Sequence, residues 1–170
     1  ARPFGIVHLA THADFESGSI NNSYIQFWNE RLRLNDVRDL GLSNPQVQLL
    51  VLSACDTALG DREAELGFGG LAVQAGVKSA VASLWAVNDV ATAALITRFY
   101  KELKTAPIKA EALREAQIAL IKEKVFVENN QIQGVEPEGI PLPNTNSSLR
   151  DQKLSHPYYW SAFTMIGNPW

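Results

Sequence analysis

The sequence predicts an α/β fold in which helices pack against a mostly parallel sheet. Three apolar runs of strand length, residues 6–11, 47–54 and 78–84, alternate with segments of helical periodicity. Short continuous apolar runs are typical of strands that are buried on both faces, as in parallel sheets. Strands that alternate with helices build such a layered fold. A chain of 170 residues is long enough for one domain with its own core.

The composition excludes several classes of function. The net charge is −3 and no basic stripe is present, so nucleic acid is not an expected partner. No apolar run approaches the roughly 20 residues that a membrane-spanning helix needs, and no signal peptide is visible. The single cysteine can form no internal disulfide, which predicts a reducing, cytoplasmic location.

Only five residues, Ala1-Arg2-Pro3 and then Phe4-Gly5, precede the first predicted strand, residues 6–11. This position would leave an apolar strand at an open edge of the sheet, and proteins normally cover such edges. We therefore expect the chain to be part of a longer protein, or a second chain to supply the missing first strands.

The segments between the first two strands are polar or alternating. Residues 14–23 are predicted to form a polar loop, residues 24–34 a hairpin that turns at Asn29-Glu30, and residues 35–40 a short helix that ends at Gly41. We expect Asn35 or Asp36 to cap this helix.

The second half of the chain is predicted to contribute three helices and a last strand. The helices span residues 67–75, 88–104 and a segment from Lys109, with a polar loop at 56–66 before the first of them. Asn88 or Asp89 is expected to cap the second. Leu95, Phe99 and Leu103 would share its apolar face, and the inward residues of the third would be Ala112, Leu113, Ala116, Ala119 and Leu120. Residues 125–156 show no pattern, and the aromatic-rich residues 158–166 predict the last strand.

Cys55 and His12 carry the strongest indication of chemistry. Each stands where an apolar strand ends, and the carboxyl ends of parallel strands form the crevice in which such folds bind ligands. A cysteine and a histidine that meet there can act as nucleophile and base. The alternative for Cys55 alone is a buried structural role, since free cysteines usually behave as small apolar residues. The position of His12 shifts the balance toward the functional interpretation.

Other motifs are weaker. Residues 67–72 fit G-x-G-x-x-G/A, and Asp89 follows at roughly the spacing of a dinucleotide site. The glycines do not directly follow a strand, however, so close packing of a helix on the sheet explains them better, and NAD binding is a minor alternative. No G-x-S-x-G or P-loop motif is present, and no paired spacing of His8, His12, His156 and Cys55 supports a metal site. His8, in mid-strand, is expected to be buried and hydrogen-bonded, and His156 to lie on the surface.

Several of these segments together resemble one family. Ile6-Val7-His8-Leu9-Ala10-Thr11-His12 is similar to the motif that carries the catalytic histidine of CHAT domains, which are caspase-like domains often joined to tetratricopeptide repeats. Val51-Leu52-Ser53-Ala54-Cys55-Asp56-Thr57-Ala58-Leu59-Gly60 resembles their catalytic-cysteine motif, and residues 75–89 and 156–163 are similar to two further blocks. The match keeps the family's order and spans nearly the whole chain.

The resemblance implies a caspase-like three-layer sandwich over residues 1–170, and a clan CD cysteine endopeptidase that needs no metal or organic cofactor. Cys55 would be the nucleophile and His12 the general base. The backbone N–H groups of Cys55 and of the residue after the histidine would hold the oxyanion. That residue is usually glycine in the family and is Ala13 here.

The resemblance also implies a specificity. The stretch from Trp85 to Asp89 is similar to W-x-V-x-D of separase, a relative that cleaves after arginine. Asp89 would then bind a basic P1 side chain; the alternative is that it only caps the following helix. Asp56 is a second candidate acid, and Trp85 would wall the substrate groove or belong to the core.

The expected partners are therefore a protein substrate and, by the same resemblance, tetratricopeptide-repeat modules or a regulatory protein. Neither nucleic acid nor a membrane is expected. The alternative from another class is a catalytically silent caspase-like module that only binds other proteins.

Overall fold

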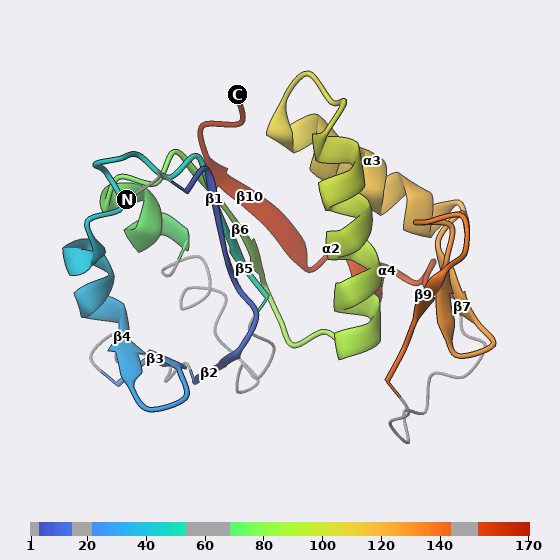
Figure 1. Cartoon of the computed structure of the whole chain (residues 1–170), viewed down its shortest axis with the longest axis horizontal. Coiled ribbons are helices and arrows are strands. Elements are labelled where there is room, and N and C mark those ends of the chain that lie inside the picture. The colour runs from blue at the N-terminus through green and yellow to red at the C-terminus, as the bar shows by residue number, and fades with distance from the viewer. Residues whose placement is uncertain (1–3, 15–21, 54–68, 144–152) are drawn as a thin grey trace. The chain divides into compact units, whose positions relative to one another are not determined.

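The computed structural model describes residues 4–14, 22–53, 69–143 and 153–170 (Figure 1). The chain divides into two compact units. The first comprises Ala1–Ala86 and Phe163–Pro169, and the second comprises Val87–Ala162 with Trp170.

The first unit contains a four-stranded sheet in the order β1-β5-β6-β10. Strands β1 (Ile6–Leu9), β5 (Leu49–Leu52) and β6 (Ser79–Ser83) are parallel, and β10 (Phe163–Gly167) runs antiparallel to β6. Every residue of β5 and β6 is buried, which confirms that these apolar runs are strands covered on both faces. The predicted mostly parallel sheet is therefore confirmed, and β1 is its end strand within the described residues.

A second, smaller sheet in this unit carries the segment after β1. Its strands are β2 (His12–Asp14), β3 (Tyr24–Gln26) and β4 (Arg31–Arg33), all antiparallel. The predicted hairpin is confirmed, and Phe27 N–H donates to the Glu30 carbonyl across its turn at 2.8 Å. The strand predicted over residues 6–11 ends two residues earlier than expected, at Leu9. The Thr11 hydroxyl donates to the Gln26 carbonyl at 2.6 Å, where the chain leaves β1 and pairs with the hairpin.

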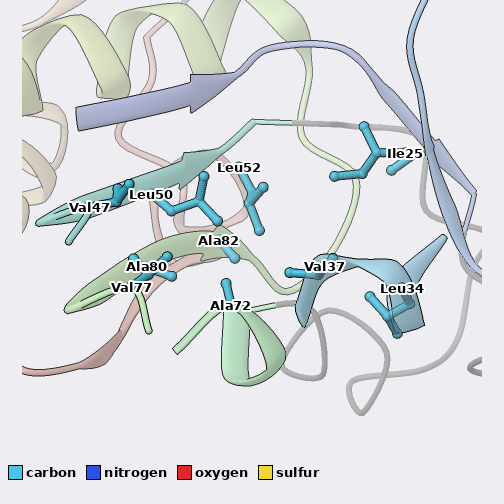
Figure 2. Packing of buried hydrophobic residues seen from close by; sticks show 11 residues of the cluster. Ile25, Leu34, Val37, Val47, Leu50, Leu52, Ala72, Val77, Ala80 and Ala82 are labelled. Carbon is cyan, nitrogen blue, oxygen red and sulfur yellow. The ribbon is translucent and has the colours of Figure 1, made fainter. Parts of the chain in front are cut away.

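The core of the first unit lies on the face of the main sheet that Leu50 and Leu52 share (Figure 2). The short 3₁₀ helix η1 (Leu34–Leu40) adds Leu34 and Val37 to this core. Gly41 ends η1 in the left-handed region at φ 64°, as predicted, but neither Asn35 nor Asp36 caps it, because the N-cap position falls on Arg33.

Residues 69–74 are helical and contribute Ala72 to the same core. Gly76 follows at φ 104°, a conformation that side chains rarely adopt, so the helix ends where the sequence predicted. A Cβ on Gly69 would lie 2.4 Å from Ile166 Cδ1, so this glycine lets the helix approach β10 closely. This contact supports the packing interpretation of the glycine motif at Gly69; residues 67 and 68 lie outside the described part of the chain.

The second unit contains two long helices, α2 (Asp89–Leu103) and α3 (Lys109–Ile121), which pack on each other. The side chain of Asn88 accepts a hydrogen bond from Val90 N–H at 2.8 Å and so caps α2. The five inward residues predicted for α3 are all buried, and Leu95 and Phe99 are fully buried on α2. Helical periodicity therefore located both apolar faces.

Residues 125–143, which were expected to be patternless, form a third small sheet. Its strands are β7 (Phe126–Glu128), β8 (Gln131–Gln133) and β9 (Ile140–Pro141). Asn129 and Asn130 link the first two with φ of 51° and 58°, and two such residues form the tight turn that matches strand twist. Val127 and Ile132 are buried opposite each other. The prediction was wrong because the strands have only two or three residues, too few to show an alternating pattern.

The predicted last strand, residues 158–166, was wrong in its first half. Pro157–Trp160 form the short helix α4 instead, with His156 Nδ1 accepting from Tyr158 N–H at 3.2 Å. Proline at the first helical position and a capping side chain favour a helix over a strand there. The strand β10 begins only at Phe163.

Of the helices described, none is long and apolar enough to cross a membrane. The three-layer arrangement of a caspase-like sandwich stays a prediction.

Candidate active site

His12 opens strand β2, directly after the chain leaves β1. Its cross-strand partner is Gln26, and its side chain is exposed. The Gln26 amide accepts a hydrogen bond from Arg31 Nε at 3.0 Å, so the neighbour of His12 is held by the next strand along. His12 is therefore accessible to a substrate and sits on a paired backbone rather than in an open loop.

Ala13, the next residue, points the opposite way. Its side chain is buried opposite Ile25. The Ser23 carbonyl accepts from Leu34 N–H, and the Glu30 carbonyl accepts from Phe27 N–H. The odd-numbered residues in and beside β3 therefore form hydrogen bonds with the β4 side. Because hydrogen-bonded and non-hydrogen-bonded pairs alternate in an antiparallel ladder, Ala13 and Ile25 form a non-hydrogen-bonded pair. The N–H of Ala13 therefore faces away from β3.

His8 and Ser53 join the ends of β1 and β5. His8 Nε2 and Ser53 Oγ are 2.8 Å apart, and Ser53 N–H donates to the Leu9 carbonyl at 3.1 Å. Partial desolvation of its ring lowers the pKa of His8 below its usual value of 6.5. The expectation that His8 is hydrogen-bonded is confirmed, but the expectation that it is buried was wrong, since its residue is exposed on the end strand.

Cys55 and Asp56 lie outside the described residues, as does the rest of the polar loop at 56–66. Ser53 is the last described residue before them. Their predicted roles are therefore untested by the geometry.

Trp85 and Asp89 belong to different units. Trp85 follows β6 and is half-buried, so it is neither a fully covered core residue nor a free surface one. Asp89 is the first residue of α2 and is exposed, while Asn88 provides the cap. The alternative in which Asp89 is the N-cap was therefore wrong, although a carboxylate in the first turn still favours the helix dipole.

No group of histidine, cysteine and acidic side chains within residues 4–14, 22–53, 69–143 and 153–170 is arranged to hold a metal ion. His156 is exposed, as expected, and its ring caps α4.

Sequence reasoning missed three residues around His12 and His8, namely Thr11, Gln26 and Ser53. Gln26 stood in the predicted hairpin, but its pairing with His12 is a contact between distant segments that local alternation does not reveal. Ser53 was part of the predicted strand, and no local signal marks it as a partner for His8.

Comparison with known proteins identifies a family for the chain. The family model of the CHAT domain matches residues 1–168. No curated protein matches the chain. Since the match covers nearly all of the 170 residues, the chain belongs to the CHAT domain family, which is caspase-like.

Proposed function

We propose that this CHAT domain is a cysteine endopeptidase that uses Cys55 as nucleophile and His12 as general base. A free thiol has a pKa of about 8.5, so only a few per cent is thiolate at neutral pH, and a neighbouring imidazole raises that fraction. The Cys55 sulfur attacks the peptide carbonyl, His12 delivers the proton to the leaving amine, and water then hydrolyses the acyl-enzyme.

The observation that carries the proposal is the register between β1 and β5. Leu9 stands opposite Leu52 in a parallel ladder. His12 follows Leu9 by three positions, and Cys55 follows Leu52 by three positions. Neighbouring strands lie about 4.8 Å apart, and three residues reach at most about 11 Å. His12 and Cys55 thus follow neighbouring, paired strands by the same number of residues, which supports the proposal that the two side chains meet at this edge of the sheet.

The backbone around His12 supports an oxyanion site. The N–H of Ala13 faces away from β3, so this donor is not used by the ladder that holds its strand. A second donor would come from the Cys55 N–H, as in caspase-like proteases. Two preorganised N–H donors are the usual means of stabilising the negative charge of a tetrahedral intermediate. Ala13 can serve in place of glycine because the role requires only its backbone.

We also propose that the enzyme cleaves after arginine or lysine. The carboxylate of Asp89 is exposed and makes no hydrogen bond or ion pair among the described residues, so it is available for a basic P1 side chain. Asp56 is the second candidate for this contact, and the half-buried Trp85 would wall the groove. A protein substrate, and control by tetratricopeptide-repeat modules or another regulatory protein, complete the proposal.

A panel of fluorogenic peptides varied only at P1 tests this function. We expect cleavage of the arginine and lysine peptides, loss of cleavage in Cys55→Ala and His12→Ala, and unchanged cleavage in His156→Asn, which alters another exposed histidine and keeps a capping group. Asp89→Ala should lose the basic preference, whereas Asp39→Ala, an exposed acid on η1, should keep it. Cleavage that survives in Cys55→Ala would contradict the proposal. Folded protein that cleaves no peptide of the panel would favour the silent binding module.

A further inference from the structure

Two polar side chains, His8 and Ser53, tie β1 to β5 at the carboxyl ends of these strands. His8 stands opposite Val51 in the parallel ladder, and Ser53 follows Val51 by two positions. Side chains two positions apart lie on the same face of a strand, so His8, Val51 and Ser53 share one face of the sheet. His8 Nε2 and Ser53 Oγ are 2.8 Å apart, which is a hydrogen-bond distance whichever of the two atoms donates.

The tie lies where the two strands separate. Ser53 N–H donates to the Leu9 carbonyl at 3.1 Å, and among the described residues this is the last backbone hydrogen bond between the two segments. After Leu9 the chain turns to β2, which pairs with β3 instead. His12 follows Leu9 by three positions, and Cys55 follows Ser53 by two. Within the described part of the chain, the tie is therefore the last link between the strands that lead to the proposed dyad.

The tie is built on a buried strand. Every residue of β5 is buried, so the strand that presents Ser53 is fixed in the core. Ser53 is half-buried, and partial desolvation of the His8 ring lowers its pKa below the usual value. The ring is therefore neutral at neutral pH. A neutral imidazole has one donor and one acceptor nitrogen, and either of them suits a hydroxyl group.

We propose that His8 and Ser53 are positioning residues of the endopeptidase, whose hydrogen bond fixes the end of β5 against β1 and so sets the approach of Cys55 to His12. The inference rests on the proposed dyad, and neither positioning residue touches the substrate or takes up the reacting proton. A nucleophile and its base must come within about 2.6–3.2 Å of each other. A misplacement of about 1 Å can cost about a hundredfold in rate, so a tie at the last paired residues acts directly on the reaction.

The pH profile of Cys55 alkylation by iodoacetamide tests this role in the whole chain. We expect the midpoint of the profile to lie near neutral pH in the wild type and to move toward about 8.5, the pKa of a free thiol, in Ser53→Ala. Ser53→Thr keeps the hydroxyl group and should keep the wild-type midpoint. In peptide cleavage, Ser53→Ala should lower kcat at least about tenfold and leave KM unchanged, because substrate contacts are not altered.

Two further variants separate positioning from a general loss of stability. Ser79→Ala is the matched control, because the buried Ser79 hydroxyl donates to the Gln48 carbonyl at 2.9 Å and joins the same sheet at the amino ends of its strands. It should leave the midpoint unchanged. His8→Ala breaks the tie from the exposed side and should shift the midpoint as Ser53→Ala does. The double variant should shift it no further, since both changes remove one interaction.

Several outcomes would overturn the inference, and circular dichroism of each variant excludes unfolding as their cause. A wild-type midpoint in Ser53→Ala and His8→Ala, together with a shifted midpoint in His12→Ala, would remove the positioning role and leave the dyad intact. An equal shift in Ser79→Ala would assign the effect to stability. Additive shifts in the double variant would show that His8 and Ser53 act separately. A wild-type profile equal to that of His12→Ala would contradict the dyad itself, and the positioning role with it.

Discussion

Replacing Ile25 tests whether the small sheet that carries His12 is held firmly on the core of the first unit. Ile25 is 1% exposed and stands opposite Ala13 in the β2–β3 ladder. Ile25→Ala removes three carbon groups, and about 0.8 kcal/mol for each gives about 2.4 kcal/mol of lost transfer free energy. The cavity left behind raises the expected loss in the free energy of unfolding to about 3–4 kcal/mol. Ile25→Val removes one group and should cost about 1 kcal/mol.

Urea denaturation followed by far-ultraviolet circular dichroism measures these losses. The matched control is Ile121→Ala, whose side chain is 42% exposed on α3 and whose replacement should cost under about 1 kcal/mol. A loss below about 1 kcal/mol for Ile25→Ala, or one equal to that of the control, would refute the reasoning. The strand with His12 would then not be anchored by this side chain.

Three further changes have definite expected results. Gly134→Ala should destabilise the protein by at least about 2 kcal/mol in urea denaturation, because φ is +81° and the new Cβ would lie 1.7 Å from the Lys124 carbonyl oxygen. Asn88→Ala should cost about 1 kcal/mol by loss of the α2 cap, and Asp89→Ala should cost less, as measured by thermal denaturation. Because partial desolvation of its ring lowers the pKa of His8, its contribution to stability should be full above pH 6.5 and should fall as the pH drops from 6.5 toward the folded pKa, which an NMR titration of the ring locates.

Each of these has a control. Gly70→Ala places a Cβ where no atom lies within 4 Å, inside a helix, so it should leave stability unchanged or raise it slightly. A greater loss for Asp89→Ala than for Asn88→Ala would return the capping role to the aspartate. His8→Gln should remove the acid-dependent loss of stability. An NMR titration that places the pKa of His8 at or above 6.5 would contradict the desolvation of its ring.

The parts of the fold that depend on strong local periodicity were predictable from the sequence. The continuous apolar runs identified β5 and β6, and the 3.6-residue spacing located the buried faces of α2 and α3. The segment from β7 to β9 was not predictable in the same way. Its strands hold single buried residues such as Val127 and Ile132, and the asparagine pair at the turn was the signal that could have revealed the hairpin.

In the candidate site, too, local features were predictable and contacts between distant segments were not. His12 and Cys55 could be singled out because each follows an apolar strand, and strand ends are local features. The pairing of His12 with Gln26 could not be predicted, because it joins segments that only the folded chain brings together. The choice between Asn88 and Asp89 as the cap was also beyond the sequence, since both are preferred cap residues and only the backbone position decides.

The alkylation rate of Cys55 tests the central claim most directly. Cys55 is the only cysteine, so every iodoacetamide adduct reports on this thiol. A free thiol has a pKa of about 8.5, so its alkylation rate rises only near that pH, whereas we expect the rate of Cys55 to rise already near neutral pH. At the same pH, the rate should be lower in His12→Ala but unchanged in His156→Asn. A thiol that does not react in the folded protein, or whose rate profile is the same in His12→Ala as in the wild type, would contradict the dyad.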